Sequence, residues 1–304
     1  MKKIEVVEVG LRDGLQNETV MLSVDQRFEI LKHLLESGIR RIEVGAFVRS
    51  DRVPQMSGTV ELLDRALRLR KDNRKFKEAI FTVLIPNQKG WDSAGDVLPD
   101  EVALFASASE TFSQKNINCS IDESFERFEP VFSLARNKKK KIRGYLSVCF
   151  GCPFEGPVDE KKVISLIGRF YKLKVDEISI GDTIGVAHAK QIKSLFSKLK
   201  SKYGLKKIAG HFHDTRGQAL TNILAAHDLG VRIFDSSIGG LGGCPYAPGA
   251  TGNVATEDLV YMTQGLTTAP GISTEKLIQL SQKIELMMSK SLPSKVSRAG
   301  LLKV

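Results

Sequence analysis

The sequence is poor in the residues on which several classes of protein depend. Only four of its 304 residues are cysteines, too few for the disulfide framework of a secreted scaffold of this length. Aromatic residues make up 7% of the chain, and none interleaves with a basic patch as a stacking platform for nucleic acid would require. No apolar run is long enough to span a membrane, and no secretory signal pattern follows Met1. We therefore expect a cytoplasmic protein that has neither a nucleic acid nor a membrane as its partner.

The chain is basic, with a net charge of +10 and a pI of about 9.4. Such a balance can favour nucleic acid, a membrane surface or a polyanionic small molecule. The charge is spread over helix-like segments, and its one dense run, at residues 138–141, is interpreted as a solvated turn between a helix and a strand. A non-catalytic nucleic-acid-binding protein is the alternative that uses this charge alone.

Short apolar runs rich in valine and isoleucine recur along the chain. There are eight, at residues 4–9, 41–46, 79–85, 101–106, 142–149, 177–180, 207–211 and 232–237. Helical periodicity fills most of the gaps, and two helices open with capping boxes, at Ser23 with Gln26 and at Ser120 with Glu123. This alternation predicts an α/β fold, the (β/α)8 TIM barrel. A doubly wound open sheet is the alternative, but residues 10–14 lack the G-x-G-x-x-G spacing of its usual first turn.

Two further helical patterns, at residues 256–265 and 273–289, follow the eighth strand and precede a basic tail. The length of the chain is common for a barrel that forms one domain. We expect a single domain over residues 1–304, with the barrel at about 4–250 and a C-terminal helical appendage at about 254–304 packed on it.

His211 and His213 end the seventh apolar run and indicate a site. Successive side chains of a strand point to opposite faces, so these two imidazoles share one face. Two hydrogen-bonded histidines at a strand end are the structural alternative. TIM barrels carry their active sites at the carboxyl ends of the strands, where polar residues of other strands are expected to gather. The candidates at this rim are Arg12, Asp13, Gln16, Glu43, Asn116, Tyr145, Asp182, Cys244 and Asn253.

A hard divalent cation suits these residues, because it prefers oxygen ligands, tolerates imidazole and keeps positions open for substrate. We choose Asp13, His211 and His213 as ligands, with Asn253 as a neutral oxygen donor. Asp182 is expected to orient the ligands. Two histidines and a carboxylate also suit Fe(II) oxygenases, although those sit more often on antiparallel scaffolds.

Two other candidates are chemically reactive. Arg12 offers a planar cation that can hold a carboxylate or stabilise an enolate oxygen, and a surface salt bridge is the alternative. Cys244 lies in a glycine-rich loop that can approach a ligand and close over it, where a thiol can serve as acid or base. An inert small residue is the alternative there. Cys149 and Cys152 form a single C-x-x-C, which we interpret as structural.

Six sequence motifs, taken together, are specific enough to indicate a protein family. They read VEVGLRDGLQNE at 7–18, VPQM at 53–56, KNINCS at 115–120, GDTIG at 181–185, HFHDT at 211–215 and GLGGCPYA at 240–247. Over residues 5–262 or so, the chain resembles the 3-hydroxy-3-methylglutaryl-CoA lyases. The resemblance implies a (β/α)8 barrel that cleaves this acyl-CoA to acetyl-CoA and acetoacetate with Mg²⁺ or Mn²⁺.

The resemblance also implies roles for individual residues. It places the metal on Asp13, His211, His213 and Asn253, and it marks Arg12, Glu43, Asp182 and Cys244 as catalytic or substrate-contacting. His211 is a further catalytic candidate, since the base that removes the C3 hydroxyl proton is left open among Asp13, Asp182 and His211. Arg12 would stabilise the enolate and Cys244 would return the proton. Gln16, Tyr145 and Asn116 are expected to contact the substrate, and the chain is expected to form a homodimer.

The chain departs from the family pattern at a few positions. Leu11 stands where proline is usual, Arg216 where tyrosine is common, and Val148 where cysteine is common. Gly45 and Ala46 replace a threonine-rich pair after Glu43, which leaves the exact hydroxy-acyl-CoA open. Claisen-condensing synthases, such as isopropylmalate or homocitrate synthase, share the Arg-Asp-Gly start and the His-x-His pair. They usually continue further and lack the Gly-Gly-Cys-Pro loop.

Overall fold

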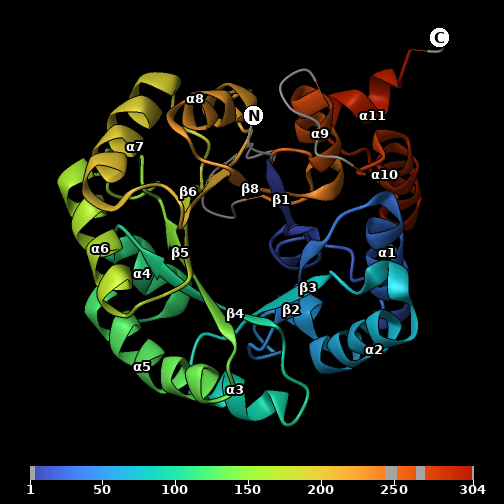
Figure 1. Cartoon of the computed structure of the whole chain (residues 1–304), viewed down its shortest axis with the longest axis horizontal. Helices are drawn as coiled ribbons and strands as arrows, with labels where there is room; N and C mark the ends of the chain where they lie inside the picture. Colours follow the sequence, from blue (N-terminus) through green and yellow to red (C-terminus); the bar gives the residue numbers. More distant parts are fainter. Residues whose placement is uncertain (1–3, 244–251, 265–270, 303–304) are drawn as a thin grey trace.

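Eight parallel strands close into a barrel in the computed structural model, which describes residues 4–243, 252–264 and 271–302 (Figure 1). The strands are β1 (Glu5–Glu8), β2 (Arg41–Ala46), β3 (Ile80–Leu84), β4 (Glu101–Ser107), β5 (Lys141–Ser147), β6 (Glu177–Asp182), β7 (Ile208–Phe212) and β8 (Ile233–Ser236). Each strand pairs with the next in the chain, and β8 pairs with β1. The predicted (β/α)8 barrel is therefore confirmed.

Helices surround the barrel (Figure 1). The helices before the last strand are α1 (Val24–Ser37), α2 (Thr59–Asp72), α3 (Gln88–Ala94), α4 (Glu110–Ile117), α5 (Ile121–Asn137), α6 (Glu160–Lys172), α7 (Ala189–Tyr203) and α8 (Ala219–Leu229). Short turns are η1 (Gly10–Gly14), η2 (Pro54–Met56), η3 (Arg74–Phe76) and η4 (Ile238–Gly240). Both predicted capping boxes are present, at the starts of α1 and α5.

The C-terminal helices are α9 (Thr256–Gln264), α10 (Thr274–Met288) and α11 (Lys295–Ala299). They occupy the part of the helical ring between α8 and α1, and α10 packs along α1 (Figure 1). The sequence interpretation of residues after 289 as a basic tail missed α11, which begins where the Ser294 hydroxyl accepts the N–H of Ser297. None of the helices within the described ranges combines the length and the apolar character needed to cross a bilayer.

The ends of two strands, β5 and β6, differ by two residues from the ends of the predicted apolar runs, whereas the other strand ends agree to within one residue. β5 ends at Ser147 because the next residue, Val148, turns into the left-handed region with a φ of 53°. β6 continues to Asp182, since Gly181 and Asp182 pair with His211 and Phe212 of β7. The extension of β6 places Asp182 beside the histidine pair.

The interior of the barrel is charged at its amino-terminal end, whereas bulky aliphatic residues are typical of TIM barrels. The Arg41 guanidinium lies 3.0 Å from carboxylate oxygens of both Glu101 and Glu177. The Arg143 guanidinium lies 2.6 Å from Glu177 and 2.6 Å from Asp235. All five residues are buried, so this network takes the place of an apolar layer.

Candidate active site

The loop after β1 carries Arg12 and Asp13 on one turn of π-helix, η1. The N–H of Gly14 donates to the carbonyl of Val9 over 3.2 Å, which closes the wide turn. Gly10 is required at its start, because a Cβ there would lie 2.6 Å from Oε1 of Glu8, the atom that accepts the Gly10 N–H. Single π-helical turns often mark functional sites.

Asp13, His211 and His213 converge at the carboxyl end of the barrel. One ligand atom from each lies within 4.8 Å of the other two. The two Nε2 atoms are 3.2 Å apart, and Asp13 Oδ2 is 3.9 Å from that of His211 and 3.7 Å from that of His213. His213 lies just after β7, and the structure brings it to the same side as His211, as the two-residue spacing predicts. A carboxylate and two imidazole nitrogens around one point form a donor set that fits a divalent cation.

The ring of His211 is oriented by Asp235, an inward-facing residue of β8. His211 Nδ1 lies 3.1 Å from Oδ2 of Asp235, which leaves Nε2 directed at Asp13. Burial would raise the pKa of Asp235, but the charges of Arg143 and His211 outweigh it and lower the pKa to about 2. Sequence reasoning missed Asp235, although an aspartate within the apolar run 232–237 was a signal.

Asn253 reaches the same point from the segment after β8, where it forms a backbone bridge to His213. Its Nδ2 donates to Asp13 Oδ2 over 2.8 Å and to the carbonyl of Leu241 over 3.2 Å. The amide nitrogen therefore faces Asp13, and a ligand role requires the amide to rotate so that its oxygen faces the cation. Gly242, with a φ of 122°, permits this close approach, because a Cβ there would lie 2.8 Å from Asn253 Nδ2.

Arg12 is held between two carboxylates on the wall of the site. Its Nη1 lies 2.7 Å from Asp13 Oδ1 and its Nη2 lies 2.9 Å from Glu43 Oε2. The Tyr145 hydroxyl donates to the same Glu43 oxygen over 3.1 Å, and the Arg12 guanidinium is 5.2 Å from the centre of the Tyr145 ring. Burial raises the pKa of Glu43 against the opposing charge of Arg12. Burial would also raise the pKa of Asp13, but the charge of Arg12 and the two histidines hold it well below its usual range.

Asp182 lies next to the histidine pair, but its carboxylate is engaged elsewhere. Its two oxygens accept the N–H groups of Val186 and Ala187, each over 2.9 Å. Its backbone carbonyl accepts the N–H of His213 over 3.2 Å. The carboxylate that orients an imidazole is thus that of Asp235, whereas Asp182 holds the backbone around His213.

The chain is similar to known proteins over nearly its whole length. A family model described as HMGL-like matches residues 3–284. The chain belongs to the HMGL-like family. It is 46% identical over 301 residues to the hydroxymethylglutaryl-CoA lyase of Pseudomonas mevalonii, with 99% of this chain and 97% of that one covered. It is 44% identical over 302 residues to the 3-hydroxy-3-isohexenylglutaryl-CoA/hydroxy-methylglutaryl-CoA lyase of Pseudomonas aeruginosa, covering 99% and 98%. The crystal structure of hydroxymethylglutaryl-CoA lyase from Pseudomonas aeruginosa superimposes with a TM-score of 0.92 at 43% identity, covering 98% and 97%.

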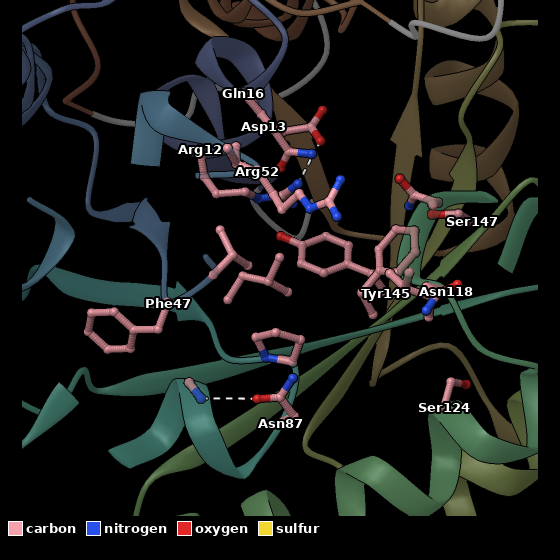
Figure 2. Close-up of a pocket in the computed structure, with 18 of the residues that line it drawn as sticks. Arg12, Asp13, Gln16, Phe47, Arg52, Asn87, Asn118, Ser124, Tyr145 and Ser147 are labelled. Carbon is pink, nitrogen blue, oxygen red and sulfur yellow. Dashed lines mark hydrogen bonds and ion pairs between the residues drawn. The ribbon is translucent and has the colours of Figure 1, made fainter. Parts of the chain in front are cut away.

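A cavity of about 1150 Å³ opens onto the site of this HMGL-like chain. Gln16, Asn116 and Tyr145, the residues predicted to contact the substrate, line it. Figure 2 shows the Tyr145 ring directed toward Arg12, with Asn118 and Ser124 across the cavity from Asp13. Basic side chains also line it: Arg49, Arg52, Lys89, Lys115 and Arg127. The cavity is thus large enough for a bulky ligand and is positively charged.

The predicted role of Cys244 depends on the loop after β8. Cys244 lies outside the described residues, so its predicted role stays a prediction. The described start of that loop reaches the site, since Asn17 Nδ2 donates to the carbonyl of Gly243 over 3.0 Å.

Gly45, one of the residues that differ from the family pattern, faces away from the cavity. A Cβ at Gly45 would lie 2.5 Å from the Thr59 hydroxyl of α2, on the outside of the barrel. A larger residue at position 45 would push α2 and would not reach the substrate directly.

Proposed function

We propose that this chain cleaves 3-hydroxy-3-methylglutaryl-CoA into acetyl-CoA and acetoacetate with the help of Mg²⁺ or Mn²⁺. The observation that carries the proposal is the convergence of Asp13, His211 and His213 beside Arg12 in a chain of the HMGL-like family. The lyase relatives match over nearly their whole length, which favours a lyase over the Claisen-condensing synthases.

Asp13, His211 and His213 would hold the cation, and Asn253 would join them once its amide has rotated. A bound divalent cation supplies a Lewis acid that lowers the pKa of the substrate's C3 hydroxyl. We look for the base that takes the hydroxyl proton among Asp13, Asp182 and His211. Asp13 and His211 line the cavity, whereas Asp182 is 1% exposed and its oxygens are bonded to backbone, which favours the first two.

Loss of the hydroxyl proton forms the C3 carbonyl as the C2–C3 bond breaks, and its electron pair passes to the enolate of the departing thioester. Arg12 supplies positive charge for that enolate oxygen. Asp13 and Glu43 fix its guanidinium, so little reorganisation is needed as charge develops. The role of Cys244 as the acid that protonates C2 rests on the sequence.

The substrate class is supported by the charge of the cavity. A CoA thioester carries several phosphate charges, and basic side chains such as Arg49 and Lys89 line the same cavity as Arg12. One relative is named for both the methyl and the isohexenyl substrate, so a longer C3 substituent belongs in the test.

The test is a coupled assay of acetoacetate release with enzyme freed of metal by EDTA. We expect no turnover in metal-free enzyme, recovery with Mg²⁺ or Mn²⁺, and no condensation of acetyl-CoA with 2-oxoacids. Parallel assays with unmethylated and isohexenyl thioesters define the acyl preference. Full turnover without metal would discard the cation site, and no cleavage of any thioester would discard the function.

Location and assembly are further parts of the proposal. The low cysteine content and the free thiols of Cys119, Cys149 and Cys152 are compatible with the cytoplasm. The predicted homodimer is tested by size-exclusion chromatography with light scattering, in which a single peak at the mass of one chain would contradict it.

A further inference from the structure

We propose that Asp235 and Arg143, two buried residues inside the barrel, are positioning residues that prepare the His211 imidazole to bind the cation. This inference rests on the cation-dependent function proposed above. Neither residue lines the cavity, so neither would touch the substrate.

Asp235 is fixed from three sides. Its Oδ2 lies 3.1 Å from His211 Nδ1 and accepts the Ser179 hydroxyl over 2.7 Å, while its Oδ1 accepts Nη2 of Arg143 over 2.6 Å. Asp235 is 1% exposed, and Arg143 and Ser179 are fully buried. A carboxylate held so firmly can place the ring of its partner within a narrow range of angles.

The chemistry of a carboxylate decides which imidazole nitrogen carries the proton. An ionised carboxylate only accepts hydrogen bonds, so His211 must present Nδ1–H to Asp235. Its Nε2 then has a free lone pair directed toward Asp13 and His213. A metal-binding histidine commonly donates its second ring N–H to a carboxylate in this way.

Arg143 connects Asp235, next to His211, with the residues that hold Arg12 on the opposite wall of the site. Besides Asp235, its Nε donates to Glu177 over 2.6 Å and its Nη1 donates to the Tyr145 hydroxyl over 2.6 Å. Tyr145 in turn donates to Glu43, which holds Arg12. The chain of contacts runs from His211 through Asp235, Arg143, Tyr145, Glu43 and Arg12 to Asp13.

This chain of contacts joins the two ends of the donor set through the floor of the site. Its members come from β2, β5, β7, β8 and the turn after β1. The spacing between Asp13 and His211 therefore depends on packing inside the barrel as well as on the loops at its rim. Substitution of Asp235 or Arg143, which belong to this chain of contacts, is expected to change cation affinity without removing a ligand.

The same interior provides a matched control. Glu101 is a buried carboxylate that accepts from Arg41 and Thr82 at the amino-terminal end of the barrel. Glu101→Gln removes one buried charge, as Asp235→Asn does, but at the end remote from the ligands. A merely structural role for Asp235 predicts that the two variants behave alike.

The experiment measures Mn²⁺ binding by electron paramagnetic resonance in the full-length enzyme without substrate. We expect Asp235→Asn to weaken Mn²⁺ binding by about 10–100-fold, the range typical of lost outer-sphere partners, whereas Glu101→Gln stays within about twofold of the unmodified chain. Ser179→Ala, which removes one hydrogen bond to Asp235, is the milder variant and should weaken binding by about fivefold. Denaturant unfolding checks that each variant is folded.

Histidine ¹⁵N spectra of the metal-free protein give a second readout. We expect Nδ1–H for His211 in the unmodified chain and a shift toward Nε2–H in Asp235→Asn, because an amide can donate to Nδ1. If Asp235→Asn left the Mn²⁺ affinity unchanged and the unmodified enzyme was active, the positioning role would be wrong and the proposed function would stand. Failure of the unmodified chain to bind Mn²⁺ would overturn this inference, and lyase activity measured in parallel would show whether the cleavage function survives.

Discussion

Glu8 is a buried residue that joins two segments next to the active site. Its Oε1 accepts the N–H groups of Gly10 and Ile238 over 2.8 and 2.9 Å, and its Oε2 accepts the Thr256 hydroxyl over 2.5 Å. The carboxylate therefore ties the turn that carries Arg12 to the segment after β8. Burial raises the pKa of Glu8 from 4.5 to about 7, despite these hydrogen bonds.

The raised pKa predicts a pH-dependent free energy of unfolding. A carboxyl whose pKa is higher in the folded state contributes most stability below pH 4.5, and the contribution is lost as the pH rises toward 7. The loss amounts to about 3 kcal/mol for a shift of this size. We expect Glu8→Gln to reduce the fall in stability between pH 5 and 7.5, measured by urea unfolding. Glu126→Gln, at an exposed position of α5, is the control, and equal pH slopes in both variants would contradict the prediction.

At the scale of elements, the turn η1 determines where Arg12 and Asp13 point. Gly10→Ala would place a methyl group 2.6 Å from Glu8 Oε1 and 3.1 Å from Ile238. The turn must shift to relieve these contacts, so we expect Mn²⁺ affinity and kcat to fall by about tenfold or more, since small misplacements of catalytic groups are costly.

Gly156→Ala provides the comparison for Gly10→Ala. A Cβ at position 156 would meet no atom within 4 Å, and the φ of Gly156 is 75°. The loss of stability in Gly156→Ala therefore measures only the cost of placing alanine in a left-handed backbone conformation. We expect this substitution to lower stability by about 1 kcal/mol and to leave Mn²⁺ affinity unchanged. If both variants bound Mn²⁺ equally well, η1 would not control the cation site.

At the scale of the whole molecule, Arg41 joins strands that are distant around the barrel. Its guanidinium lies 3.0 Å from Glu5 of β1, from Glu101 of β4 and from Glu177 of β6. These contacts cross the interior at the amino-terminal end, opposite the cavity. The contacts with Glu101 and Glu177 therefore connect β2 to strands with which it shares no backbone hydrogen bonds, whereas β1 is its neighbour in the sheet.

Arg41→Met leaves the buried Glu101 without its counter-charge, while Glu177 keeps its ion pair with Arg143. We expect the free energy of unfolding to fall by about 3–5 kcal/mol, because uncompensated buried charge is costly. Arg49→Met, which breaks the exposed pair with Asp51, should leave the free energy of unfolding almost unchanged, because solvent screens an exposed ion pair. Urea unfolding measures both, and a similar small effect in the two variants would show that the interior network adds little to stability.

Local patterns within the sequence determined most of the elements of the barrel. The capping boxes at Ser23 and Ser120 involve residues three apart, so their neighbours alone specify them. Eight largely apolar runs were enough for the barrel, because parallel strands that are covered on both faces are rich in apolar residues, even though some inward positions here are charged. The two-residue spacing of His211 and His213 places both side chains on one face of the strand. The sequence motifs are sufficient to indicate the family, without any contact between distant segments.

Contacts between distant segments were decided only by the tertiary structure. Whether Asp235 meets His211 depends on how β8 lies beside β7, and the apolar run containing Asp235 does not encode that register. The amide of Asn253 is turned by Asp13 and Leu241, which lie 240 and 12 residues away. Arg41 and Arg143 lie in strands whose composition predicts burial, yet only the closed barrel surrounds them with carboxylates. A charge can stay buried only where its partners converge, and that convergence belongs to the fold as a whole.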